Sequence, residues 1–153
     1  MRLTTKSRYG TRMVLDIAIN GTEKPVPVSE ISRRQNISFK YLEKLISLLK
    51  QGNILKSHRG PFGGHMLARP ATEITVGDLV RLFEDRGAIT DCAEKNAKTC
   101  DECNLAGECI TQWVWIEASK AMFDRLDKIT IATLLEKFDD GRIFEEKNHS
   151  DMR

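Results

Sequence analysis

The pattern of apolar and polar positions predicts a mostly helical chain. Apolar residues recur at helical spacing over 6–20, and a second, short helix is expected from residue 28 or 29 to 35. A third helix is expected over 39–50. Apolar positions three and four residues apart indicate a helix with one buried face, so these three helices should pack on a common core.

Turn signals join the second and third helices tightly. Asn36 follows the second helix, and asparagine tolerates the left-handed backbone conformation that ends helices. Ser38 can cap the third helix by accepting a hydrogen bond from a free backbone N–H. Two short helices joined by such a turn resemble a helix-turn-helix, whose second helix enters the major groove of DNA.

A hairpin is expected directly after the third helix. Residues 54–58 and 65–68 read as strands on either side of Arg-Gly-Pro-Phe-Gly-Gly, residues 59–64. Three glycines and a proline suit a hairpin tip. A hairpin in this position is a wing, and its glycines would let it approach a phosphate backbone closely.

The second half of the chain predicts three more helices, over 74–85, 110–127 and 131–138. The apolar positions of 110–127 wrap wider than one packing face requires, which indicates a seam between subunits. We therefore expect a homodimer, with an interface that includes Trp113, Ile116 and Phe123.

These elements divide the chain into four segments. We expect a winged helix-turn-helix DNA-binding domain over 1–86 and a cysteine loop over 87–109. A dimerisation helix with a final helix follows over 110–138, and 139–153 is a polar tail expected to be disordered. The fold class is mainly α with a small β part (α+β).

Composition and length narrow the class of protein. The chain has 153 residues, about one domain, and is 41% hydrophobic and 30% charged, as a globular protein is. No apolar run reaches the roughly 18 residues that a membrane span needs, and the N-terminus lacks an apolar signal core. We therefore expect a cytoplasmic protein without a membrane partner.

Charge is divided unevenly along the chain. Residues 1–70 carry 13 Lys and Arg against 4 Asp and Glu, whereas residues 71–153 carry 11 against 18. A basic half points to a polyanion such as double-stranded DNA, although basic residues can also merely solvate helices. Glu43 is an acidic residue among the lysines of the expected recognition helix, where a carboxylate would act as a specificity filter. The expected DNA contacts are Arg2, Lys6, Ser38, Lys40, Tyr41, Glu43, Lys44, Lys56, Arg59 and Gly60.

All four cysteines lie within residues 92–109, spaced C-x7-C-x2-C-x5-C. In a reducing cytosol such clustering favours metal or redox chemistry over structural disulfides. Cys109 begins the long helix, where the helix dipole stabilises a thiolate. Four thiolates fit an iron–sulfur cluster or zinc, and a metal-free thiol switch also fits. A small redox carrier is a further alternative, but no signature of an enzyme is present.

Particular motifs give a family resemblance. The opening Met-Arg-Leu-Thr, the Tyr-Leu-Glu at 41–43 and the Arg-Gly-Pro-x-Gly-Gly at 59–64 are similar to those of the IscR-type winged-helix transcription factors of bacteria. The resemblance runs from Met1 to about Phe138. It implies a homodimer that pairs through the long helix and binds palindromic operators.

The resemblance also implies an iron–sulfur cluster, 2Fe–2S or 4Fe–4S, held by three cysteines before the long helix. It assigns Cys92, Cys103 and Cys109 to that trio. A histidine completes the site in IscR, and the corresponding place here is Gln112. We therefore expect Cys100 to be the fourth ligand, and a non-cysteine or exchangeable ligand is the alternative. The expected function is that of a repressor, with operator affinity controlled by a cluster that senses iron, redox or nitric oxide status.

Overall fold

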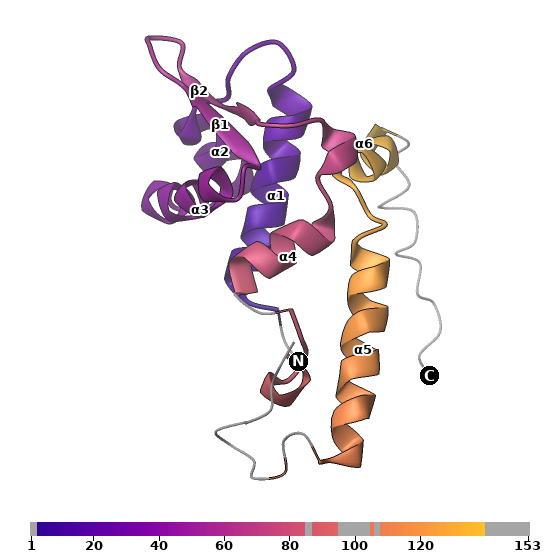
Figure 1. The fold of residues 1–153 in the computed structure, drawn as a ribbon. Coiled ribbons are helices and arrows are strands. Elements are labelled where there is room, and N and C mark those ends of the chain that lie inside the picture. Colours follow the sequence, from indigo (N-terminus) through magenta and orange to yellow (C-terminus); the bar gives the residue numbers. More distant parts are fainter. Residues whose placement is uncertain (1–2, 85–86, 95–104, 106–107, 140–153) are drawn as a thin grey trace, which may run out of the picture.

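The computed structural model describes residues 3–84, 87–94, 105 and 108–139. Helices α1 to α4 and the hairpin gather into a head, and α5 runs beside the head and beyond it (Figure 1). The elements are α1 (Thr5–Asn20), α2 (Val28–Gln35), α3 (Phe39–Gln51), β1 (Leu55–His58), β2 (Gly64–Leu67), the 3-10 turn η1 (Ala71–Glu73), α4 (Val76–Glu84), the 3-10 turn η2 (Asp91–Ala93), α5 (Ile110–Leu126) and α6 (Ile131–Asp139). Every predicted helix and strand is present, with its ends within two residues of the predicted positions.

The head is built around α1. Met13, Val14 and Ile17 are at most 1% exposed, and they face apolar side chains from α3 and α4, among them Leu45 and Leu79. Each such side chain stabilises the fold by about 1.5–3 kcal/mol when it leaves water. The helical spacing of these residues therefore gives the head its single core.

The helix-turn-helix of α2 and α3 is confirmed in its turn and its cap. Asn36 has φ 53° and ψ 49°, the left-handed conformation that ends α2. Ser38 Oγ accepts a hydrogen bond from the backbone N–H of Tyr41 at 3.3 Å, which caps α3.

A buried carboxylate joins α1 to α2. Asp16 is 3% exposed, and it accepts hydrogen bonds from Arg34 at 2.6–3.2 Å and from the Gln35 amide at 2.7 Å. These hydrogen bonds raise the pKa of the Arg34 guanidinium above its ordinary value. The single buried residue of α2 is Ile31, so this polar contact largely determines how α2 lies against α1.

The hairpin is antiparallel, with Leu55 opposite Leu67 and His58 opposite Gly64. Its second strand is also bonded to the loop before α2, because Val26 and His65 exchange backbone hydrogen bonds of 2.9 Å in both directions. The root of the wing is therefore fixed to the helix-turn-helix.

The C-terminal helices meet the head at its other side. The backbone N–H of Ile131 donates to Ile74 O at 2.9 Å, and Ile131 is fully buried, so α6 packs in the head beside α1. Helix α5 contacts α4 and η2, and its buried residues are Ser119 and Phe123. None of the helices that the structure describes is both long and apolar enough to cross a bilayer.

Candidate functional site

The first turns of α3 separate into a core face and a water face. Leu42 is fully buried, whereas Lys40, Glu43 and Lys44 are exposed. The N-terminal turns of a recognition helix are the part that reaches base edges. The two lysines and the glutamate are therefore free to meet a partner from solvent.

Tyr41 is half-buried, unlike its charged neighbours. Its ring meets that of Tyr9 edge to face, with centroids 6.1 Å apart, and the guanidinium carbon of Arg12 lies 5.5 Å from the centre of the Tyr9 ring. An edge-to-face aromatic pair adds about 0.5–1.5 kcal/mol. Tyr41 thus fixes the start of α3 against α1.

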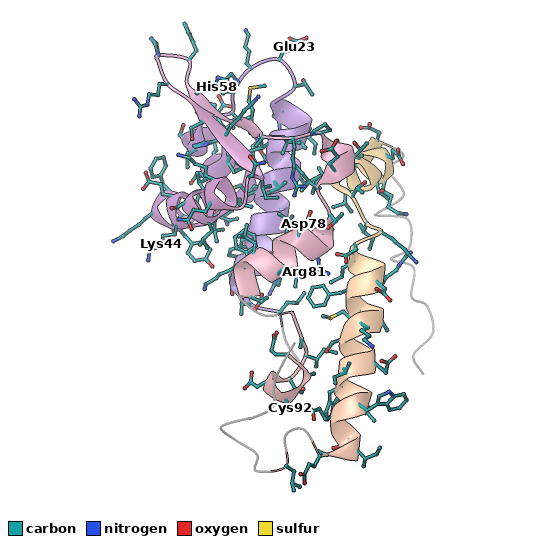
Figure 2. All side chains as sticks on the ribbon, in the orientation of Figure 1. Glu23, Lys44, His58, Asp78, Arg81 and Cys92 are labelled. Atoms are coloured by element: carbon teal, nitrogen blue, oxygen red, sulfur yellow. The ribbon has the colours of Figure 1, made fainter. Side chains whose placement is uncertain are left out.

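The wing adds further exposed cationic residues to the same side of the molecule. Lys56, His58, Arg59 and Gly60 are all exposed. Lys44 on α3 and His58 on the hairpin both lie on the side away from α5 (Figure 2). The recognition helix and the wing therefore form one surface, which we call the reading face: the first turns of α3 together with residues 56–63.

Of the two phosphate contacts expected near the start of the first helix, Lys6 is exposed, and Arg2 lies outside the described residues. Arg12, a further cation of this helix, donates to the side chain and the backbone oxygen of Gln35, at 3.1 and 2.7 Å. Its guanidinium therefore joins α1 to the end of α2.

The last residue of α4 caps the start of α1. The Glu84 carboxylate accepts hydrogen bonds from the Thr4 backbone N–H and hydroxyl, both at 2.9 Å, and from the Ser7 hydroxyl. Burial would raise the pKa of Glu84, but these hydrogen bonds outweigh it and the pKa lies below its ordinary value. The segment that leads to the cysteines therefore follows Glu84, a residue that is hydrogen-bonded to the start of α1.

Two of the four cysteines, Cys92 and Cys109, are described, and both are free thiols. Cys100 and Cys103 lie outside the described residues. Cys109 is the N-cap of α5, and its Sγ lies 2.9 Å from the Thr111 hydroxyl. This hydrogen bond, with those from the backbone N–H groups of Gln112 and Thr111, lowers the pKa of Cys109. Its surroundings therefore favour the thiolate.

Hydrogen bonds hold residues 87–94, the Cys92 segment, against α5. Ser119 Oγ accepts from the Ile89 backbone N–H at 2.9 Å, and the Gln112 amide donates to the Cys92 carbonyl oxygen at 2.5 Å. The Glu94 carboxylate closes the segment by accepting from two of its backbone N–H groups. Cys92 accordingly lies beside α5 in Figure 2.

Sequence reasoning missed the docking role of Ser119. The sequence did contain a signal for this role, because a serine interrupts the apolar positions of the long helix.

The cysteines that the structure describes are suitable ligands for a soft metal centre. No group of three or more His, Cys, Asp or Glu side chains gathers at one point within the described residues. Cys92 and Cys109 are nevertheless two sulfur donors outside any disulfide, one of them in surroundings that favour the thiolate form that binds metals. Sulfur ligands of this kind select iron–sulfur clusters and zinc.

The outer face of α5 is apolar and uncovered. Ile110 is 83% exposed, Trp113 63%, Val114 46% and Trp115 43%. Ile116 is half-buried.

Phe123 differs from the other two expected interface residues. It is 6% exposed, because the Arg81 guanidinium lies over its ring at 4.2 Å while pairing with Asp127. Packing within its own chain leaves Phe123 little surface for a partner.

Known proteins resemble this chain along most of its length. The Rrf2 family model, described as an iron-dependent transcriptional regulator, matches residues 3–137. Protein rrf2 of Nitratidesulfovibrio vulgaris is 47% identical over 135 residues, which cover 88% of this chain and 87% of that protein.

Two solved structures share the fold. The T. potens IscR structure has a TM-score of 0.73 at 31% identity and covers 93% of this chain and 91% of that one. The structure of CymR, the global cysteine regulator of B. subtilis, has a TM-score of 0.72 at 28% identity and covers 89% and 97%. These likenesses confirm the winged-helix fold and the resemblance found in the motifs. The chain therefore belongs to the Rrf2 family of DNA-binding transcriptional regulators.

Proposed function

We propose that this Rrf2-family regulator is a homodimeric repressor whose affinity for a palindromic operator is set by an iron–sulfur cluster. The ligands of the proposed cluster are Cys92, Cys100, Cys103 and Cys109. The observation that carries the proposal is the docking of the Cys92 segment on α5 through Ser119 and Gln112, next to a helix that begins at Cys109. The family's description as iron-dependent supports it.

The proposed control works through the position of the thiols. The Cys92 segment follows α4, whose last residue Glu84 holds the start of α1, and it is bonded on its other side to α5. When bound, an iron–sulfur cluster supplies a centre that is lost or altered as iron, oxygen or nitric oxide levels change. Ligation at Cys92 and Cys109 would fasten the head to the start of α5. A coupling of about 1–3 kcal/mol changes affinity roughly 5–150-fold, which is enough for a genetic switch.

The reading face supplies the proposed contacts with the operator. Lys40 and Lys44 would reach base edges or phosphates, and Glu43 would accept from a cytosine amine and reject other bases. Lys6 and Lys56 would contact phosphates, and Arg59 would enter the minor groove from the root of the wing. Arg2 is proposed as a further phosphate contact.

The proposed partner for the outer face of α5 is a second copy of this chain. Four large apolar side chains lie exposed along one helix, two of them tryptophans, and tryptophan is enriched in interface cores. Pairing of two copies would place two reading faces on the half-sites of a palindrome. Sedimentation of Trp113→Glu should give a monomer, whereas a variant that stays dimeric would remove Trp113 from the seam.

The test of cluster control compares loaded and empty protein. Protein purified without air should be brown and contain iron and acid-labile sulfide, whereas zinc protein is colourless. Cys103→Ala should lose the cluster, and Cys100→Ala should alter its spectrum if Cys100 is a ligand. Equal operator affinity of the loaded and empty forms would reject the sensing role. Arg59→Ala should weaken operator binding without unfolding the protein.

A metal-free thiol switch is the second candidate. The lowered pKa of Cys109 favours it, because the thiolate is the form that reacts with oxidants. The likeness to CymR, described as a cysteine regulator, supports it as well. Air-free protein without iron or sulfide that still loses operator affinity on mild oxidation would establish this alternative.

A further inference from the structure

The tip of the wing presents an aromatic side chain to solvent. Phe62 is 89% exposed, the highest value among the large apolar residues that the structure describes as exposed, and Pro61 beside it is also exposed. A single exposed apolar residue is ordinary on a protein surface. Its meaning here depends on how the turn holds it and on what surrounds it.

The turn keeps Phe62 away from the body of the protein. The Gly63 N–H donates to Gly60 O at 2.9 Å, which closes a four-residue turn with Pro61 and Phe62 at its centre. Gly60 has φ +119°, which few other residues adopt, and a Cβ on Gly63 would come within 2.5 Å of the His58 carbonyl oxygen. Proline also fixes its own φ. The backbone that carries the aromatic ring therefore has little conformational freedom.

The surroundings of the ring are those of a DNA-binding surface. Arg59 precedes the turn, Lys56 lies on the adjoining strand, and the lysines of α3 lie on the same reading face. Proteins that bind the minor groove often combine such cations with apolar wedges, phenylalanine and proline among them, which enter between base pairs.

We propose that Phe62 is such a wedge: it enters the minor groove of the operator and partly unstacks one base step in each half-site. This inference rests on the proposed contact of the wing with DNA and adds a means of reading sequence to it. Pyrimidine–purine steps unstack most easily, so Phe62 would favour TA or CA/TG at a position that no polar side chain contacts.

The experiment uses the full-length protein and a duplex that it selects from a random-sequence pool. The duplex carries 2-aminopurine in place of single adenines near the expected wing position, because this base brightens when it is unstacked. The variants are Phe62→Ala, which removes the wedge, and Phe62→Leu, which keeps an apolar one. Phe138→Ala is the matched control, since Phe138 is a half-exposed phenylalanine on α6.

Wild-type protein should brighten one step in each half-site. Phe62→Ala should lose that signal and bind about tenfold more weakly, because the opened step lets the bent duplex contact more protein surface. Its melting temperature should not change, since the ring is 89% exposed. Phe62→Leu should keep most of the signal, and Phe138→Ala should match wild type.

A Phe62→Ala protein that still brightens the same step, or that binds within about twofold of wild type, would overturn the wedge. Arg59→Ala separates this failure from that of the proposed function. If Arg59→Ala weakens binding while Phe62→Ala does not, the wing contacts DNA without a wedge. If neither does, the wing contact itself is wrong.

Discussion

Asp16→Asn should destabilise the protein markedly, although the substitution changes only one oxygen to an amide nitrogen. Asp16 is 3% exposed and accepts the hydrogen bonds that the Arg34 guanidinium and the Gln35 side-chain N–H donate to α1. In the variant an amide group would face guanidinium N–H groups, so at least one hydrogen bond would be replaced by two opposed donors. The Arg34 charge would keep its position but lose its buried partner.

The expected cost follows from how far water reaches the pair. Removing one partner of a fully buried ion pair costs about 3–5 kcal/mol. The Arg34 side chain is 25% exposed and keeps Glu30 at 2.9 Å, so we expect a smaller loss of about 2 kcal/mol. With a urea slope of about 2 kcal/mol per M, the unfolding midpoint should fall by about 1 M.

The assay is urea unfolding followed by far-ultraviolet circular dichroism at one fixed protein concentration. Glu30→Gln is the matched control, because this half-exposed partner of Arg34 should contribute no more than about 0.5 kcal/mol. The double variant Asp16→Leu with Arg34→Met should be more stable than Asp16→Asn, since neither charge is then left unpaired. An Asp16→Asn midpoint equal to that of wild type would refute the idea that this pair fixes α2 on α1.

Three other variants test separate parts of the molecule. Glu84→Gln should reduce stability at pH 7 but not at low pH: the folded pKa lies below the ordinary 4.5, so the carboxylate stabilises above that value and loses its effect as the pH falls through the folded pKa. Unfolding free energies that differ from wild type by the same amount at pH 7 and pH 3 would contradict this. Leu79→Ala, at a fully buried position of α4, should cost about 3 kcal/mol in urea unfolding, and a loss below about 1 kcal/mol would mean that the head core relaxes around it. Arg81→Ala should lower the melting temperature by a few degrees, a loss of about 1 kcal/mol, because it uncovers the Phe123 ring and unpairs Asp127. Asp127→Asn should reproduce only part of that shift.

Local signals were sufficient to predict most of the elements. Thr75 and Asp78 form a capping box, with hydrogen bonds of 3.0 and 3.2 Å in the two directions. Thr130 caps α6 by accepting from the Thr133 N–H at 3.1 Å. These interactions join residues three apart, so the sequence contains both partners of each.

Long-range polar partners could not be predicted in the same way. Arg12 is one of several cations on a basic helix, and its hydrogen-bond partner Gln35 lies 23 residues away. Asp16 looks like a solvated charge, but the fold buries it beneath Arg34. Side chains of these types can face water or a distant partner, and only the packing of α2 on α1 decides which.

The two candidate sites differ in the same way, because one follows from local sequence signals and the other depends on long-range partners. The reading face follows from helix and hairpin patterns, and its charged side chains are exposed as expected, whereas Tyr41 is half-buried. The docking of Cys92 on α5 depends on Ser119, 30 residues from its partner Ile89, and no spacing rule anticipates it. The ligand set at Cys100 and Cys103 remains a prediction from spacing and family resemblance.

The placement of the tryptophans gives this protein an optical property of its own. The chain has two tryptophans, and both are partly exposed on α5. Its tryptophan emission therefore comes from one helix and should shift to shorter wavelength when a second copy covers that helix. A bound chromophore at the start of the same helix would quench the tryptophan emission. One fluorescence measurement can therefore follow both self-association and cofactor loading. Unfolding confined to the head would leave the tryptophan emission unchanged.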